Sequence, residues 1–133
     1  MENLFAYGTL MCEDIMLDVS GCNLAHLQGT LRGYRRRAVK GEHYPAIVSD
    51  ERSAVEGVVY RGVPDSAWCR LDAFEGEMYA RHAVEVELSD GTMLLADTYV
   101  VVPAFLDRLD SSDWDLTGFL RDGKARFQAN YRG

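Results

Sequence analysis

Alternation of apolar and polar residues predicts a hairpin in the second half of the chain. Between residues 84 and 88, valine or leucine alternates with glutamate, which is the pattern of a strand with one buried and one solvated face. Asp90-Gly91 follows, and this dipeptide is a strong signal for a tight turn between antiparallel strands. We therefore predict a strand over residues 83–88 and its partner over residues 93–102.

Four other segments have the composition of strands. Residues 4–7 are mostly apolar and stop at Gly8, which indicates a short strand. Residues 27–39 mix glycines with β-branched and aromatic side chains, so they form one bent strand or two short ones. Residues 46–48 and 54–60 are expected as two further strands.

Helical spacing marks the regions between and after these strands. Residues 13–19 carry apolar side chains at helical spacing behind an acidic start, as in a short helix. A second helix is expected to open at Pro64, to bury one apolar face and to end at Gly76. Pro103 starts a helical turn, and residues 115–131 carry a broken helical stripe of apolar residues.

Short strands with inserted and appended helices predict an α+β fold, and the strand spacing permits a small closed or nearly closed sheet. The chain has 133 residues, of which 47% are hydrophobic. That is enough for one domain with a core of its own, so we predict a single domain over residues 1–133.

The charge balance argues against nucleic acid as a partner. The net charge is −7, and an acidic chain gains little from a phosphate backbone. The exception is a basic run, which consists of Arg32, Arg35, Arg36, Arg37 and Lys40. An anion or RNA patch is one reading of this run, but we interpret it as the solvated face of a long strand in an acidic protein.

The cysteines and the N-terminus favour a cytoplasmic protein. Cys12, Cys22 and Cys69 are widely spaced without a CxxC pair, which excludes a thioredoxin-type motif and a zinc ribbon and indicates reduced thiols. Residues 1–5 carry an acid and no basic region, unlike a signal peptide. No apolar run approaches the roughly 20 residues of a membrane span, so no membrane partner is expected.

Common catalytic and metal-binding signatures are missing. His26, His43 and His82 lie in unrelated segments, and Cys22, four residues before His26, lacks a second ligand pair. The sequence has neither the GxSxG motif of serine hydrolases nor the GxxxxGK[ST] loop of nucleotide-binding proteins. We therefore predict no metal site.

Two segments are candidates for a site. At residues 7–10 a strand stops at a glycine just before a helix, and such a turn leaves free backbone N–H groups that can hold an anion. Glu75 stands between an aromatic residue and a glycine at a helix end, where it opposes the helix dipole. A carboxylate near apolar walls can have a raised pKa and act as acid and base. Asp72 and Glu77 are open to a capping or solvating role.

Six stretches of the chain, in order from residue 4 to residue 102, follow a known pattern. They are LFAYGTLM (4–11), LQGTLRGY (27–34), HYPAIV (43–48), VEGVVYRGV (55–63), LDAFEGEMYARHAVEVEL (71–88) and ADTYVVV (96–102). The set resembles the gamma-glutamyl cyclotransferase-like superfamily, especially the branch of avirulence-induced proteins and gamma-glutamylamine cyclotransferases. YGTL alone is modest evidence, whereas YGTL, YPAIV and LDAFEGEMY in succession are specific.

The resemblance implies a small mixed β-barrel of about six strands flanked by helices, with a cavity at one end. Glu75 matches the catalytic glutamate of that pattern. The implied substrate-binding residues are Tyr7, Gly8, Thr9 and Leu10, whose backbone groups would hold the glutamyl moiety, together with Tyr44, Pro45 and Tyr79 near the cavity. No metal or organic cofactor belongs to the pattern.

The implied reaction cyclises a small γ-glutamyl molecule to 5-oxoproline and releases a free amine or amino acid. One carboxylate can carry both proton transfers, and the loop N–H groups suit a carboxylate or a developing oxyanion. The leaving amine and the oligomeric state stay open. Two alternatives also stay open, because a fold does not fix a chemistry. One is a different acid–base or acyl-transfer reaction on a related small amine, and the other is a non-catalytic small-molecule-binding module.

Overall fold

The computed structural model describes the backbone of residues 2–132 and the side chains of residues 2–129. The strands are β1 (Glu2–Ala6), β2 (His26–Val39), β3 (Pro45–Val63), β4 (Tyr79–Leu88), β5 (Met93–Val101) and β6 (Leu109–Asp113). The helices are α1 (Glu13–Ser20), α2 (Asp65–Glu75), α3 (Leu116–Gly118) and α4 (Lys124–Arg132). Three tighter or wider turns complete the order, η1 (Thr9–Met11) and η2 (Pro103–Arg108) of 3-10 type and η3 (Phe119–Gly123) of π type.

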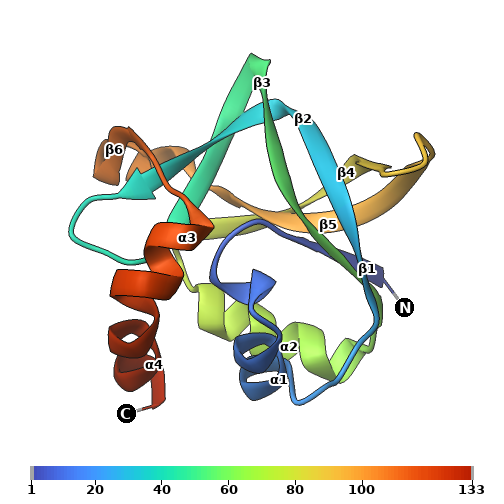
Figure 1. Cartoon of the computed structure of the whole chain (residues 1–133), viewed down its shortest axis with the longest axis horizontal. Helices are drawn as coiled ribbons and strands as arrows, with labels where there is room; N and C mark the ends of the chain where they lie inside the picture. The colour runs from blue at the N-terminus through green and yellow to red at the C-terminus, as the bar shows by residue number, and fades with distance from the viewer. Residues whose placement is uncertain (1, 133) are drawn as a thin grey trace.

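Five strands close into a barrel. They are hydrogen-bonded in the order β3-β1-β5-β4-β2, and β3 also pairs with β2, which closes the ring (Figure 1). β6 is an additional strand that pairs with the end of β2. The β1–β5 pair is parallel and the other pairs are antiparallel. The predicted α+β class and the mixed barrel of about six strands with flanking helices are therefore confirmed.

β3 corrects the sequence prediction in one respect. Residues 46–48 and 54–60 are not two strands but parts of one, β3. Residues 27–39 belong to the single strand β2, which is one of the two possibilities that the sequence left open. The pairing with β2 shifts between Arg32↔Ala54 and Tyr34↔Ser49, so residues 50–53 form a bulge within β3. This bulge contains the charged residues that interrupt the apolar pattern, which is why the sequence suggested a break.

The helices begin and end close to their predicted positions. α1 ends at Gly21 and α2 at Gly76, and both glycines have a positive φ, of 73° and 75°. The broken stripe of the tail corresponds to α3, the π turn and α4 in succession. Of the helices described between residues 2 and 132, none has the length and apolar character needed to cross a membrane.

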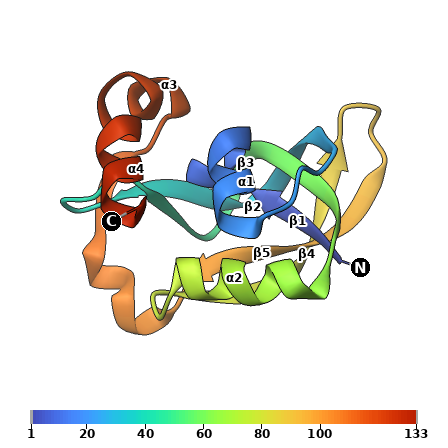
Figure 2. The same cartoon turned by 90° about the horizontal axis from the view of Figure 1, so that it is seen from below.

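Two apolar clusters meet along β1, whose side chains alternate between them. One fills the barrel and includes Phe5, Leu31, Ile47, Val59 and Val86. The other lies between the barrel and the helices and includes Leu4, Ile15, Tyr60, Leu71 and Phe119. α1 packs against α2, and α1, α2 and α4 gather at the same end of the barrel (Figures 1 and 2). The helices thus surround the segment where β1 ends.

The basic run on β2 does not form a free cationic patch. Four of its members contact acids and carbonyls of neighbouring elements, as in Arg32–Glu87 (3.2 Å), Arg35–Asp113 (3.0 Å), Arg37–Asp110 O (2.7 Å) and Lys40–Asp107 O (3.1 Å). Arg36 differs, because its guanidinium turns inward to the carbonyl of Tyr7. The interpretation of the run as a solvated face is therefore wrong for Arg36.

Candidate active site

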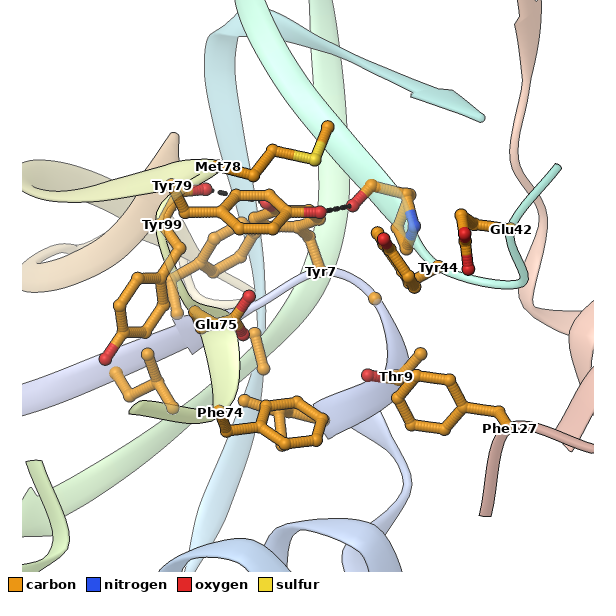
Figure 3. A pocket seen from close by; sticks show the side chains of 16 residues that line it. Tyr7, Thr9, Glu42, Tyr44, Phe74, Glu75, Met78, Tyr79, Tyr99 and Phe127 are labelled. Atoms are coloured by element: carbon orange, nitrogen blue, oxygen red, sulfur yellow. Dashed lines mark hydrogen bonds between the residues drawn. The ribbon is translucent and has the colours of Figure 1, made fainter. Parts of the chain in front are cut away.

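One cavity of about 250 Å³ brings all eight predicted site residues together (Figure 3). They are Tyr7, Gly8, Thr9, Leu10, Tyr44, Pro45, Glu75 and Tyr79. These residues come from the turn that follows β1, the start of β3 and the residue before it, the end of α2 and the start of β4. The barrel and the helix that follows β3 thus bring together residues that are up to 72 positions apart in the sequence.

Glu75 lies at the end of α2 and points into the cavity (Figure 3). Gly76, with its positive φ, stops the helix directly after it. No hydrogen bond or ion pair reaches the Glu75 carboxyl from the side chains and backbone described for residues 2–129. Burial, followed by the nearby charge of Asp72, raises the pKa of Glu75 to about 8. A carboxyl group with this pKa can both take and return a proton near neutral pH.

Three cavity tyrosines donate their hydroxyl hydrogens to the protein. Tyr7 Oη donates to Tyr99 O at 2.6 Å, and Tyr79 Oη donates to Pro45 O at 2.7 Å. Tyr99 Oη donates to Asp72 Oδ1 at 2.6 Å. Burial is the main cause that raises the pKa of all three phenols above the ordinary value. They therefore stay protonated, and these three residues line the cavity without supplying a base.

Gly8 begins the turn that forms one wall of the cavity. Met11 N donates to Gly8 O at 3.0 Å and Cys12 N donates to Thr9 O at 3.1 Å, which closes a 3-10 turn. The N–H groups of Thr9 and Leu10 come first in this turn and have no acceptor within it. A Cβ atom on Gly8 would lie 2.7 Å from Cγ of Pro45, so the turn rests directly on the opposite wall.

Asp72 and Glu77, whose roles the sequence left open, have different surroundings in the structure. Asp72 lies one helical turn before Glu75, accepts the Tyr99 hydroxyl and is 3.7 Å from Arg81. Its charge contributes to the raised pKa of Glu75. Glu77 is exposed and does not line the cavity.

Sequence reasoning missed several residues of the cavity. These are Leu4, Phe5, Ala6, Glu42, Phe74, Met78, Tyr99 and Phe127. Some stand inside the recognised motifs, since Phe74 precedes Glu75 and Tyr99 belongs to ADTYVVV, so proximity in sequence could have found them. Phe127 comes from α4, and only its place in the apolar stripe of the tail gave a signal. Its ring contacts those of Phe74 and Tyr44, at centroid distances of 5.9 and 6.4 Å.

The histidines take no part in this cavity. His26 pairs with Glu13 at 3.2 Å, and His43 packs close to Gly123. Within residues 2–129, no three His, Cys, Asp or Glu side chains come together as metal ligands would. The ionisable side chains of the cavity are two carboxyl groups and four phenols, those of Glu42, Glu75, Tyr7, Tyr44, Tyr79 and Tyr99.

Comparison with known proteins gives the family of this chain. The family described as gamma-glutamyl cyclotransferase, AIG2-like, matches residues 4–116. The chain belongs to this family. Membership confirms the resemblance recognised in the sequence, and the matched range contains every residue predicted for the site.

Individual relatives agree with the family assignment. AIG2-like protein D of Arabidopsis thaliana is 32% identical, over 91% of this chain and 86% of its own length. AIG2-like protein C of the same plant is 35% identical over 74% of this chain, which spans only 58% of that longer protein. A solved structure described as gamma-glutamyl cyclotransferase covers 99% of this chain and 86% of its own, with a TM-score of 0.70. Its identity of 17% makes this a likeness of fold.

Proposed function

We propose that this protein is a γ-glutamyl cyclotransferase-type enzyme with Glu75 as its general acid and base. The observation that carries the proposal is the Glu75 carboxyl, which faces a cavity without a hydrogen-bond partner among the described residues and has a pKa raised to about 8. Family membership supports a cyclotransferase-like role. The substrate would be a small γ-glutamyl compound, and no cofactor, nucleic acid or membrane takes part in the proposed reaction.

The proposed reaction needs one proton carrier. The Glu75 carboxylate takes a proton from the α-ammonium of the substrate, and the free α-amine then attacks the γ-carbonyl carbon. A new C–N bond closes the five-membered ring and gives a tetrahedral intermediate. The protonated Glu75 returns its proton to the leaving nitrogen as the old C–N bond breaks. The ring nitrogen gives up its second hydrogen as a proton to the released amine, so the products are 5-oxoproline and a protonated amine, and Glu75 is again a carboxylate.

The raised pKa of Glu75 suits this exchange. A carboxylate with an ordinary pKa near 4.5 would be too weak a base to accept a proton from an ammonium group at useful rates. A pKa of about 8 brings the pKa of Glu75 closer to that of the ammonium group that donates the proton. The substrate ammonium, placed beside Glu75, would also favour the ionised carboxylate at the start of the reaction.

The walls of the cavity would hold the substrate in a folded conformation. The N–H groups of Thr9 and Leu10, which have no acceptor within their turn, are suited to the substrate α-carboxylate or to the oxyanion. Tyr44, Pro45 and Tyr79 would form the opposite wall. Because the reaction is intramolecular, holding the chain folded supplies a large part of the rate.

A substrate panel tests the proposal directly. The purified protein is incubated with γ-glutamyl amino acids and γ-glutamyl alkylamines, and 5-oxoproline and the free amine are quantified by mass spectrometry. Equimolar release of both products from at least one compound is the expected result. Binding without release would instead indicate a binding module, and release of glutamate in place of 5-oxoproline would indicate hydrolysis.

A further inference from the structure

Two segments form facing walls of the cavity, the Gly8 turn and the Tyr44–Pro45 wall. Next to each of them, a backbone carbonyl accepts a hydrogen bond from a side chain of another element. Arg36 on β2 donates from Nη1 to the carbonyl of Tyr7 at 2.7 Å. Trp114, between β6 and α3, donates from Nε1 to the carbonyl of His43 at 2.9 Å. Neither Tyr7 nor His43 lies in a strand, so the backbone ladders of the barrel do not fix these two carbonyls.

Arg36 and Trp114 also contact each other. The guanidinium carbon of Arg36 lies 5.2 Å from the centroid of the indole ring, which is the distance of a cation–π interaction. The pairing Arg37↔Asp113 between β2 and β6 brings their segments together. The two side chains therefore form one unit, the Arg36–Trp114 clamp, which contacts both walls at once.

Burial of the Arg36 guanidinium costs free energy, and the pairing of the barrel strands does not require this burial. Its guanidinium is partly buried, and burial lowers its pKa, against the opposing charges of Asp113, Asp115 and Glu56. Moving a charge out of water is unfavourable unless its hydrogen bonds compensate. Its compensation is the pair of carbonyls that it binds, Tyr7 O at the cavity and Glu56 O at 3.2 Å on β3. Arg36 thus ties the Gly8 turn to the barrel wall.

The wall opposite the Gly8 turn has a second attachment. The hydroxyl of Tyr79 donates to Pro45 O at 2.7 Å from within the cavity, while Trp114 holds His43 O from outside. The Gly8 turn is also held at two points, because Arg36 binds the carbonyl of Tyr7 and the hydroxyl of Tyr60 donates to Leu10 O at 2.7 Å. The Arg36 bond lies at the residue directly before Gly8, next to the N–H groups of the turn.

We propose that Arg36 and Trp114 are positioning residues of the active site, which set the spacing between the Gly8 turn and the Tyr44–Pro45 wall. This inference rests on the proposed cyclotransferase function and deepens it. Through Tyr7, Arg36 orients the N–H groups that would bind the glutamyl group. Through His43, Trp114 sets the wall that closes over the same group.

Two conservative substitutions test the clamp, and the chain offers matched controls. Arg36→Lys keeps the positive charge but loses the planar fork of donors, and Trp114→Phe keeps an aromatic ring but loses the N–H donor. Arg37→Lys changes the next residue of the same strand, which binds Asp110 O away from the cavity. Trp68→Phe removes a buried indole N–H that has no hydrogen-bond partner among the residues whose side chains the structure describes.

The kinetic result expected is a split between the two variants. Arg36→Lys should lower kcat about tenfold or more, because misplaced loop amides no longer orient the reacting groups. Trp114→Phe should raise KM about two- to tenfold with little change in kcat, since Tyr79 still holds the wall. The two controls should lower thermal stability at most and leave both constants within about twofold of the parent. Changes in the clamp variants no larger than those in the controls would overturn the proposal.

Amide hydrogen exchange by NMR keeps the test independent of turnover. In Arg36→Lys, the amides of Met11 and Cys12, which close the Gly8 turn, should exchange faster than in Arg37→Lys. In Trp114→Phe, the amide of Glu42, which donates to Val39 O, should exchange faster than in Trp68→Phe. If no γ-glutamyl compound is turned over, the proposed function fails, but unchanged exchange at these amides is what rejects the clamp.

Discussion

The β4–β5 hairpin and the cavity end of the barrel are built in different ways. The hairpin runs in unbroken register from Tyr79↔Val101 to Glu87↔Met93, and Asp90 closes its turn through Thr92. The cavity end collects side chains from β1, the segment before β3, α2, β4, β5 and α4. In the hairpin, neighbours in sequence stabilise each other. At the cavity, the carboxyl of Glu75 is held among aromatic residues at a cost in stability.

The difference between the hairpin and the cavity shows which carboxyl group lowers the stability of the fold. The solvated face of β4 carries glutamates that remain in contact with water, such as Glu85, which costs the fold little. Glu75 is enclosed by the cavity, and its pKa is raised to about 8 because its ionised form is poorly solvated. Groups placed against local stability in this way are more often functional than average. Changes at the cavity should therefore alter activity, whereas changes in the hairpin should alter stability at most.

Glu75→Gln is expected to have the largest effect on activity. Glutamine has nearly the same shape but cannot carry a proton, so turnover should fall about 10² to 10⁴-fold while the fold is retained. The matched change in the hairpin, Glu85→Gln, should leave turnover unchanged. Rates of 5-oxoproline release and far-UV circular dichroism check both points. A folded Glu75→Gln variant with full activity would remove Glu75 from the mechanism.

The same contrast explains which parts could be predicted from the sequence. The hairpin follows from alternation and from Asp90-Gly91, and the bounds of α2 follow from Pro64 and Gly76. The motif pattern also led to Glu75 and the Gly8 turn. Each of these features depends on residues that are close together in the chain, so local sequence patterns were enough to predict it.

Other parts depend on contacts between distant segments, which no local pattern contains. The continuity of β3 through residues 50–53 comes from its long pairing with β2, although charged residues interrupt the apolar pattern. Arg36 stands among other arginines in the sequence, and its contacts with the Tyr7 carbonyl and with Trp114 distinguish it from them only in the folded chain. Phe127 enters the cavity because α4 packs back toward Phe74.

Gly8→Val and Gly91→Val should separate crowding at the cavity from strain in the hairpin. A Cβ on Gly8 would meet Pro45 at 2.7 Å, so the valine should push the turn away and weaken 5-oxoproline binding about tenfold or more. Gly91 has φ 86° but open space around it, so Gly91→Val should cost about 1 kcal/mol of stability without changing affinity. Calorimetry and thermal unfolding give the two readouts. Equal affinity of both variants for 5-oxoproline would exclude the turn from the site.

The pH dependence of activity should reflect the enclosed position of Glu75. Because its working form as a base is the carboxylate, kcat/KM should rise with pH and level off near pH 8, about tenfold per pH unit well below that value. Asp72→Asn removes a charge that raises this pKa, so the rising limb should move to lower pH. Asp90→Asn in the hairpin should leave the limb in place. The profile should be the same with EDTA, and a rate abolished by chelator and restored by zinc would contradict the single-carboxylate mechanism.

The smallest effect expected is on stability, and it has a definite sign. The folded protein keeps a proton on Glu75 up to about pH 8, whereas the unfolded chain releases it near pH 4.5. Between these values the folded state binds more protons, so the contribution of Glu75 to stability decreases as pH rises.

Glu75→Gln removes this pH-dependent loss of stability. Relative to the parent, the variant should gain nothing near pH 4 and about 1 to 2 kcal/mol above pH 8, less than the full shift implies because the cavity admits water. Thermal unfolding should show this gain as a few degrees in Tm. Glu85→Gln, on the solvated face of β4, is the control variant. A Glu75→Gln difference in Tm that does not grow with pH would show that the Glu75 carboxyl is not enclosed.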